Sequence, residues 1–183
     1  MKRKTTKELL AESFLELAEN KRIDKITITE IAQNCGMSQP TFYNHFKDKY
    51  DLIVWIYVSS SNIIMSKIGK DGYQWRDTLF DAARQFLDNR DFVLNALKHT
   101  GGKDSFVENL RRINIDLLTA EVRKRLVGET IPDELLGIMR VYVYGTVQMM
   151  LEWLLDPSKL TPDQVAVIWE KSLPEELRQY LYP

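Results

Sequence analysis

Apolar residues recur at helical spacing along almost the whole chain, and capping signals divide them into successive helices. The first capping box pairs Thr5 with Glu8, and Leu10, Phe14 and Ala18 follow at intervals of four. We therefore predict a first helix that runs to about Asn20. Similar signals recur to the C-terminus, so the sequence predicts an all-α protein of about nine to ten helices.

The strongest local signals lie in residues 27–52. Thr27 and Glu30 form a second capping box, which predicts that a short helix begins at Ile28. Gly36 follows this helix, and glycine enters the left-handed region without the steric cost of a Cβ. We therefore expect the chain to turn at Gly36 and to begin another helix soon afterwards.

The next helix has a good N-cap in Ser38 and a proline in its first turn, Pro40, where the missing N–H loses no partner. Phe42 and Phe46 lie four residues apart and form its predicted core face. Its exposed face is predicted to hold Gln39, Thr41, Tyr43, Asn44, His45 and Lys47. Two helices joined by a glycine turn, the second with a donor-rich face, are typical of a helix-turn-helix that reads the major groove of DNA.

A long helix is predicted after a third capping signal, Asp48 with Asp51, because no helix breaker occurs before Gly69 or Gly72. A shift at its far end would move the DNA reader rigidly. Further helices are predicted over 75–89, 92–100, 106–127, 134–155 and 163–171, with stops at Gly101-Gly102 and Gly128 and a short last helix after Pro174.

Charge alone does not establish nucleic-acid binding, since the 183 residues have a formal net charge of −1. Lys2, Arg3, Lys4 and Lys7 crowd the N-terminus, and we interpret them either as an arm along phosphates or as a solvated terminus. The 44% hydrophobic and 28% charged composition is that of a soluble globular protein. Apolar runs are too short for a membrane span, so we expect a cytoplasmic protein.

Metal, cofactor and enzyme chemistry are not predicted. Cys35 is the only cysteine, and His45 and His99 show no metal-ligand spacing. The run 101–103 resembles a phosphate loop only superficially, because Asp104 stands where Ser or Thr would hold the metal. No nucleophile elbow or acid–base pair stands out, so we predict a non-enzyme.

The N-terminal motifs resemble the TetR/AcrR family of transcriptional regulators. The resemblance rests on T-I-T-E-I-A, C-G-M-S and Q-P-T-F-Y-N-H-F-K-D-K-Y-D-L, which occupy residues 27–32, 35–38 and 39–52. Later segments, W-R-D-T-L-F, F-V-L-N-A-L-K-H-T-G-G-K-D-S-F and V-Y-V-Y-G-T-V, look like the C-terminal domain of the group that includes the dihydroxyacetone kinase operon activator. The resemblance implies a TetR-like fold, with a helix-turn-helix domain over 1–62 and a helical dimerisation and effector domain over 63–183.

The helix-turn-helix and the resemblance together predict which residues contact DNA. Candidates for base contact are Gln39, Thr41, Tyr43 and Asn44, and candidates for phosphate contact are Thr27, Thr29, His45 and Lys49, with Pro40 and Lys47 completing the surface. The implied partner is a near-palindromic double-stranded operator bound by a homodimer. The leading prediction is a repressor; the alternatives are an activator that responds to a partner protein and a helical interaction module without DNA binding.

The second domain is predicted to sense an effector and to dimerise. The resemblance implies a small apolar or amphipathic effector, for which lining candidates are Trp55, Met65, Phe80, Phe86, Phe92, His99, Phe106 and Tyr142, although each is also explained as core. The late helices are more apolar than one surface requires, which indicates either an isologous dimer or the centre of a monomer. The predicted dimer residues are Tyr142, Gly145, Met149, Trp153, Val165, Ile168 and Trp169.

Overall fold

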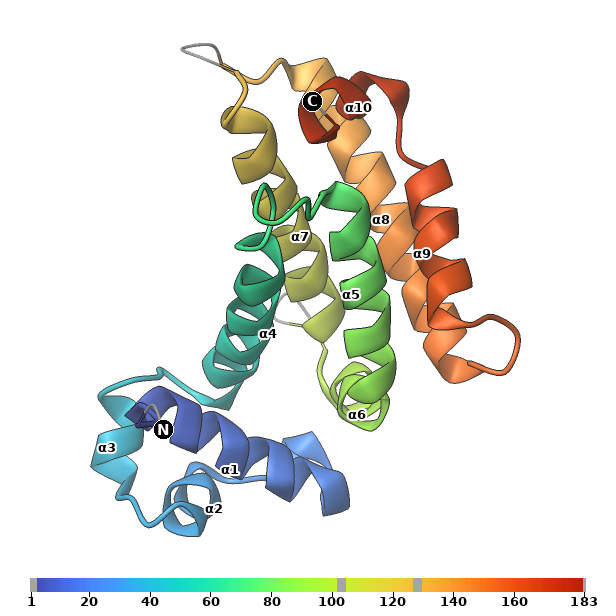
Figure 1. Cartoon of the computed structure of the whole chain (residues 1–183). Helices are drawn as coiled ribbons and strands as arrows, with labels where there is room; N and C mark the ends of the chain where they lie inside the picture. The colour runs from blue at the N-terminus through green and yellow to red at the C-terminus, as the bar shows by residue number, and fades with distance from the viewer. Residues whose placement is uncertain (1–2, 102–104, 127–129, 183) are drawn as a thin grey trace. The chain divides into compact units, whose positions relative to one another are not determined.

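The computed structural model describes residues 3–101, 105–126 and 130–182, and these residues are all-α, as predicted (Figure 1). The elements are α1 (Thr6–Asn20), η1 (Ile23–Lys25), α2 (Ile28–Asn34), α3 (Gln39–Tyr43), α4 (Lys49–Met65), α5 (Trp75–Asp88), α6 (Arg90–His99), α7 (Phe106–Arg123), α8 (Asp133–Leu155), α9 (Pro162–Lys171) and α10 (Glu175–Leu181). Lys2, the predicted stops at Gly102 and Gly128, and the Lys103-Asp104 pair lie outside the described residues.

The chain forms two compact units, and α6 belongs almost wholly to the first. The first unit comprises Met1–Ser60 and Asp91–Phe106, and the second comprises Ser61–Arg90 and Val107–Pro183. The sequence-based boundary at residue 62 assigned α6 to the second domain. Its aromatic contacts explain the difference, because the ring of Phe92 lies 6.1 Å from that of Phe14 on α1 in an edge-to-face arrangement.

The first unit has a core of fully buried apolar side chains supplied by each of its early helices, among them Leu10, Phe14, Ile31, Phe42 and Leu52. Local capping sets where these helices begin. Both hydrogen bonds of the capping box are present at the start of α1 and again at the start of α2, and the hydroxyl of Ser38 caps α3. The predicted helix starts are therefore confirmed.

The turn between α2 and α3 is built on Gly36, which has a φ of 70°. The N–H of Met37 donates to the carbonyl of Ala32 at 2.8 Å, and the N–H of Gly36 donates to that of Gln33 at 3.0 Å. These bonds satisfy carbonyls that the end of α2 leaves without helical partners. The chain thus leaves α2 at the predicted glycine and enters α3 at Ser38.

Helix α4 ends at Met65, earlier than the glycines that were predicted to stop it. Beyond it the N–H groups of Lys67 and Ile68 bond to carbonyls three residues back, and Gly69, Asp71 and Gly72 all have positive φ. The tightened turn and the left-handed residues explain the end of the helix. Helix α7 likewise ends at Arg123 instead of residue 127.

The second unit pairs α5 with α9 in antiparallel fashion. Arg76 pairs with Glu170 near one end and Arg84 pairs with Asp163 near the other, at 3.3 and 2.9 Å. Figure 1 shows α8 beside this pair, and the capping box of Thr161 begins α9 as predicted. No helix in the described part of the chain is long and apolar enough to cross a membrane.

Candidate nucleic-acid interface

Helix α3 separates a buried face from an exposed one, as its sequence predicts. Phe42 is fully buried, and its ring holds the ring of Tyr43 edge-on at 5.8 Å. Tyr43 itself is 55% exposed. Gln39, Pro40 and Asn44 are also exposed, so the side chains on this face of α3 are accessible and the opposite face packs in the core.

The amide of Gln39 is held in place by the neighbouring helix. Its Nε2 donates to Oγ1 of Thr29 on α2, at 2.9 Å. An amide nitrogen has two N–H groups and an amide oxygen two acceptor positions, so this bond leaves one donor and the whole oxygen available. The side chain is therefore oriented in advance while keeping both kinds of hydrogen-bonding group.

Two of the predicted contact residues, Thr27 and Thr41, use their hydroxyls in helix N-caps: Thr27 is itself the cap of α2, and Thr41 bonds to the cap residue of α3. Oγ1 of Thr27 donates to the carboxylate of Glu30 at 2.9 Å and accepts from the N–H of Glu30 at 3.2 Å. Oγ1 of Thr41 lies 2.9 Å from Oγ of Ser38, the N-cap of α3. Both hydroxyls therefore have a structural role independent of any contact with DNA.

Glu30 joins the start of α2 to the end of α1. Its carboxylate accepts from Nζ of Lys21 and from the N–H and hydroxyl of Thr27. The Lys21 hydrogen bond and the bonds from Thr27 lower the pKa of Glu30 from 4.5 to about 2. The capping box thus contains an ionised carboxylate across the neutral range.

Lys49 has a structural role that the sequence did not reveal. Its Nζ donates to the carbonyls of Ile23, Asp24 and Ile26, at 2.8, 2.9 and 2.9 Å. An ammonium group has three donors, and these three bonds use all of them. Burial lowers the pKa of Lys49. The predicted phosphate contact by Lys49 remains untested, and this arrangement counts against it.

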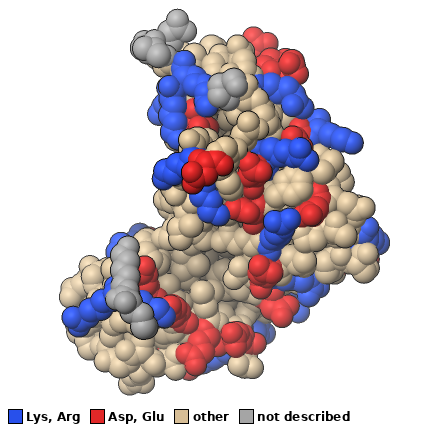
Figure 2. All heavy atoms as spheres, in the orientation of Figure 1, with Lys and Arg blue, Asp and Glu red and all other residues tan. Residues whose placement is uncertain are grey.

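Acidic side chains occupy the outer face of α1. Glu8, Glu12, Glu16 and Glu19 are exposed there, and Figure 2 shows a band of acidic residues across this unit, with basic side chains near the chain start. Such a face would repel phosphates. Among the predicted contact residues, Lys47 is exposed and His45 is half-buried, and both follow the exposed face of α3.

The eight predicted effector residues are divided between the two units. The first unit contains Trp55, Phe92, His99 and Phe106, and the second contains Met65, Phe80, Phe86 and Tyr142. Several are engaged in core contacts: the rings of Phe92 and Phe106 lie 6.2 Å apart, and the hydroxyl of Tyr142 donates to the carbonyl of Trp169 at 3.0 Å. Their role in ligand binding stays a prediction.

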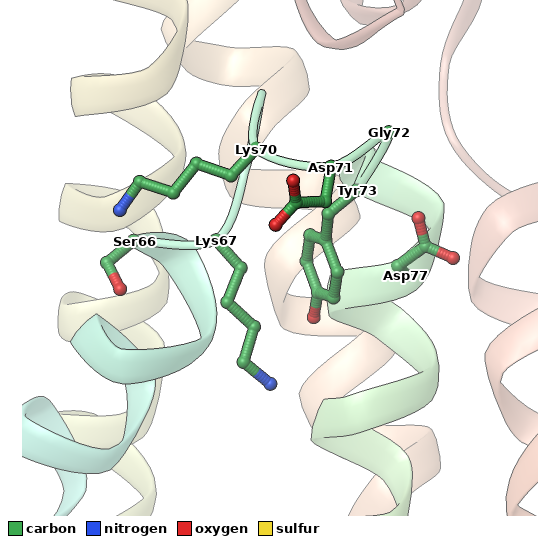
Figure 3. A pocket seen from close by; sticks show the side chains of 7 residues that line it. All are labelled: Ser66, Lys67, Lys70, Asp71, Gly72, Tyr73 and Asp77. Atoms are coloured by element: carbon green, nitrogen blue, oxygen red, sulfur yellow. The ribbon is translucent and has the colours of Figure 1, made fainter.

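An open hollow of about 510 Å³ lies at the turn between α4 and α5 (Figure 3). It is lined by Ser66, Lys67, Lys70, Asp71, Gly72, Tyr73 and Asp77, none of which was among the predicted effector residues. Nζ of Lys67 and the hydroxyl of Tyr73 both donate to Oδ2 of Asp81, each at 2.7 Å. The hollow has a polar lining that shares no residue with the effector site predicted from the sequence.

The residues predicted for dimerisation separate into core and surface. Tyr142, Trp153, Val165 and Trp169 are each at most 8% exposed within the single chain, so little of these side chains is left for a second copy to cover, and their role in a dimer stays a prediction. Gly145 is exposed and Met149 and Ile168 are half-buried. The apolar groups that α8 leaves uncovered are instead Val141, Tyr144 and Leu155, which are 77%, 44% and 63% exposed.

Sequence reasoning missed two polar residues that organise the first unit. Oγ of Ser13, 3% exposed, donates to the carbonyl of Ile31 at 2.7 Å and so joins α1 to α2. Asn95 on α6 bonds to three backbone groups near the end of α1. In both cases the available signal was a polar residue on the apolar face of a helix, beside Leu10 and Phe14 or Phe92 and Ala96.

No cluster of side chains suited to a metal ion occurs among the residues for which positions are described. The fold and the exposed α3 define a helix-turn-helix unit attached to a second helical unit. Residues 15–54 match the profile described as "Bacterial regulatory proteins, tetR family", and residues 73–175 match the profile described as "Transcriptional regulator C-terminal region" of the TetR type. The chain therefore belongs to the TetR family of transcriptional regulators.

Among known proteins, the chain is similar to the HTH-type dhaKLM operon transcriptional activator DhaS of Lactococcus lactis subsp. lactis (strain IL1403). The two are 25% identical over 87 residues, which cover 48% of this chain and 46% of the relative. The match thus spans less than half of that protein.

Solved structures of the family share the fold over nearly the whole chain. The dihydroxyacetone kinase operon activator DhaS superposes with a TM-score of 0.67 and 17% identity, over 96% of this chain and 98% of the other. A TetR transcriptional regulator from Rhodococcus sp. RHA1 has a TM-score of 0.61 and 18% identity, over 98% and 100%. FadR of Thermus thermophilus, a TetR-family repressor solved with lauroyl-CoA, has a TM-score of 0.57 and 15% identity. The superposition covers 91% of this chain and 92% of FadR.

Proposed function

We propose that this chain is a sequence-specific DNA-binding transcriptional regulator that acts as a dimer. The observation that carries the proposal is the exposed face of α3, where the Gln39 amide is held by Thr29 and Tyr43 is 55% exposed above the buried Phe42. A short helix with oriented polar groups and a rigid apolar base is what recognition in the major groove requires.

Gln39 is the leading candidate for reading a base. Its free N–H and its oxygen can bond together to N7 and N6 of adenine, the pairing that glutamine geometry favours. The bond to Thr29 fixes the amide beforehand, which reduces the entropy lost on binding. Thr29 is then a positioning residue for Gln39 as much as a phosphate contact.

Tyr43, Asn44, Pro40 and Lys47 complete the proposed surface. The exposed ring of Tyr43 and the side chain of Pro40 suit thymine methyl groups or sugars, and the ammonium of Lys47 suits a phosphate. We assign Lys49 to the structure of the unit, since its three donors are used by backbone carbonyls.

The proposed dimer forms through the outer face of α8. Val141, Tyr144, Gly145 and Leu155 lie at helical spacing and form a stripe on one side of α8, which also carries the exposed Gln148 and Glu152. A Cβ added at Gly145 meets nothing within 4 Å in the chain itself, which leaves room for close approach by a second helix. An isologous contact would pair this stripe with its own copy.

We propose that the second unit controls DNA binding through an effector or a partner protein. The relatives include proteins described as an activator and as a repressor, and the repressor was solved in complex with lauroyl-CoA. Repression remains the first candidate for this chain; activation is the second, favoured by the similarity to DhaS over 87 residues.

The deciding experiment is to recover the preferred DNA from random duplexes and from fragments of the source genome. A regulator retains duplexes with a common, near-palindromic sequence, and its affinity falls steeply with salt because counterions are released from phosphates. Tyr43→Ala serves as the matched control. Failure to retain any duplex at low salt would leave the helical interaction module as the better explanation.

A further inference from the structure

The exposed face of α8 is arranged symmetrically about Gln148. Tyr144 and Glu152 each lie four residues from Gln148, and Val141 and Leu155 each lie seven residues from it. All five residues are exposed in the single chain. Four residues are just over one helical turn and seven are just under two, so the five side chains share one side of the helix. A partner that covers this face must therefore fit both an apolar stripe and a carboxylate.

A second copy of α8 matches this order when the two helices run antiparallel. A two-fold axis exchanges the positions before it along one helix with the positions after it along the other. With the axis at Gln148, Val141 faces Leu155 of the second copy, and Tyr144 faces Glu152 of the second copy. The two apolar side chains then cover each other, and the carboxylate lies beside an aromatic ring.

The ring of Tyr144 carries a cation from the neighbouring helix. The guanidinium of Arg111 on α7 lies over this ring, with Cζ 4.8 Å from the ring centroid. Its Nη1 donates to the carboxylate of Glu108 at 2.8 Å, and its buried Nε has no hydrogen-bond partner within the described part of the chain. The side chain is still 23% exposed. A guanidinium has five N–H donors, so Arg111 retains donors for another carboxylate.

The carboxylate of Glu152 is suited to accept from such a cation. It lies on the exposed face and accepts a hydrogen bond from Nε2 of Gln148 at 2.9 Å. An ionised carboxylate has about four acceptor positions, so this bond leaves room for a further donor. Within one chain, Glu152 lies about 12 Å along α8 from Tyr144, the ring that carries Arg111. The two-fold arrangement brings together charges that the single chain keeps apart.

We propose that a second copy of this chain docks on α8 in the register centred on Gln148, and that Arg111 of each copy binds Glu152 of the other. The apolar stripe supplies the buried area, and the two symmetry-related charge pairs select the register, because a shifted register moves each carboxylate away from its guanidinium. Arg111 comes from α7, outside the late helices that the sequence predicted for dimerisation. This inference rests on the dimer proposed above.

The alternative register has its axis at Gly145, where the absence of a side chain allows close approach. Glu152 would then face Ile138 of the second copy. An ionised carboxylate placed against an aliphatic side chain loses water without gaining a donor. The register centred on Gln148 avoids this loss.

Disulfide cross-linking of the full chain distinguishes the two registers. Cys35, the only cysteine, is first replaced by serine. Helix axes about 8–10 Å apart place the Cα atoms of residues on the two-fold axis about 4–5 Å apart, within reach of a disulfide. Gln148→Cys is therefore expected to form covalent dimers at least about tenfold faster than Gly145→Cys under mild oxidation. Equal rates, faster cross-linking of Gly145→Cys, or a dimer in which neither variant cross-links would overturn the proposed register.

Charge reversal tests the pairing of Arg111 with Glu152. Arg111→Glu and Glu152→Arg are each expected to weaken dimerisation at least about tenfold, because each homodimer then contains two like-charge contacts. An equimolar mixture of the two variants should associate at least about threefold more tightly than either alone, since the mixed dimer again contains two opposite-charge pairs. Sedimentation measures both effects. Arg112→Glu, at an exposed site on α7, is the matched control and should dimerise as wild type.

Failure of the mixture to recover association would overturn the charge pair between the copies. A loss of dimerisation in Arg112→Glu as large as that in Arg111→Glu would do the same, since it would show only an effect of net charge. A wild type that is monomeric at every concentration would contradict the proposed dimer instead, so the two failures are distinguishable.

Discussion

Nε2 of Gln39 lies 2.9 Å from Oγ1 of Thr29, so a side chain of α2 sets the orientation of the first residue of α3. The hydrogen bond assigns different roles to two residues that solvent exposure alone would not distinguish. Gln39 offers groups to a base edge, whereas Thr29 holds those groups in place. Specificity at one base pair is therefore expected to depend on a residue that need not touch that base.

Thr29→Val should relax specificity at the position that Gln39 reads. The variant keeps the shape of the side chain but removes the hydroxyl that accepts from Nε2, so the amide can rotate. We expect discrimination between the best and second-best base to fall by about 1 kcal/mol, within the range for one paired base contact. Competition titrations with single-base variants of the selected duplex measure this, and Thr29→Ser should behave as wild type. Unchanged discrimination in Thr29→Val would remove the positioning role.

Tyr43→Ala should weaken specific binding by ~1–3 kcal/mol and leave the thermal unfolding midpoint nearly unchanged. The reason is that Tyr43 is 55% exposed and its support, Phe42, stays in the core. Tyr43→Phe separates the contribution of the ring from that of the hydroxyl. An equal loss of affinity on selected and unrelated duplexes would make Tyr43 a phosphate contact.

Lys49→Met should destabilise the protein by about 2–4 kcal/mol, because three carbonyls lose a charged donor. Chemical denaturation measures the change. Lys47→Met is the matched control, since its exposed side chain is proposed to contact phosphate and its loss should lower the salt slope of DNA binding by about 1. The opposite pattern, a stable Lys49→Met with a reduced salt slope, would restore Lys49 as a phosphate contact.

Capping by Glu30 predicts acid sensitivity of the first unit. The pKa of Glu30 falls from 4.5 to about 2 on folding, so its contribution to stability is complete above pH 4.5 and is lost as the pH falls toward 2. Wild type should therefore lose stability over this interval more steeply than Glu30→Gln, which cannot ionise. Thermal unfolding at several pH values compares them, and parallel profiles would show that Glu30 is not responsible.

Gly145→Arg should separate the dimer without harming the single chain. A Cβ added at this position meets nothing within 4 Å in the chain, and arginine favours a helix more than glycine does. Burying its charge in the proposed apolar contact should weaken dimerisation at least about tenfold. Sedimentation over a range of concentrations measures the effect, with Ala120→Arg, at an exposed site on α7, as control. A dimer unaffected by Gly145→Arg would exclude this face.

The parts of the structure that follow from local chemistry were predicted from the sequence. Thr5, Thr27, Ser38 and Thr161 all begin helices where expected, because a cap and its partner lie within three residues of each other. The turn at Gly36 was also predicted, because the preference of glycine for positive φ is a local property of the residue. The exposed face of α3 was predicted as well, because Phe42 and Phe46 lie four residues apart and mark the opposite, buried face.

The parts that depend on distant partners were not predicted. The carbonyls that accept from Lys49 lie more than 20 residues away in the sequence, and the helix end that bonds to Asn95 lies more than 70 residues away. Helical spacing does not identify such pairs. Helix α8 is apolar on more than one face, so its sequence did not reveal that Trp153 is core and Val141 is surface. Tertiary contacts distinguish the two faces, among them the hydrogen bonds from Tyr142 to the carbonyl of Trp169 and from Trp153 to the carbonyl of Leu160.

The most direct test of the central claim is a titration of wild type and Tyr43→Ala against the selected duplex and a scrambled duplex, at 50 and 200 mM salt. The account predicts that wild type prefers the selected duplex by at least about 10³-fold at the higher salt, that salt weakens binding to both duplexes, and that Tyr43→Ala loses much of the preference. Equal affinity of wild type for the two duplexes at both salt concentrations would contradict it.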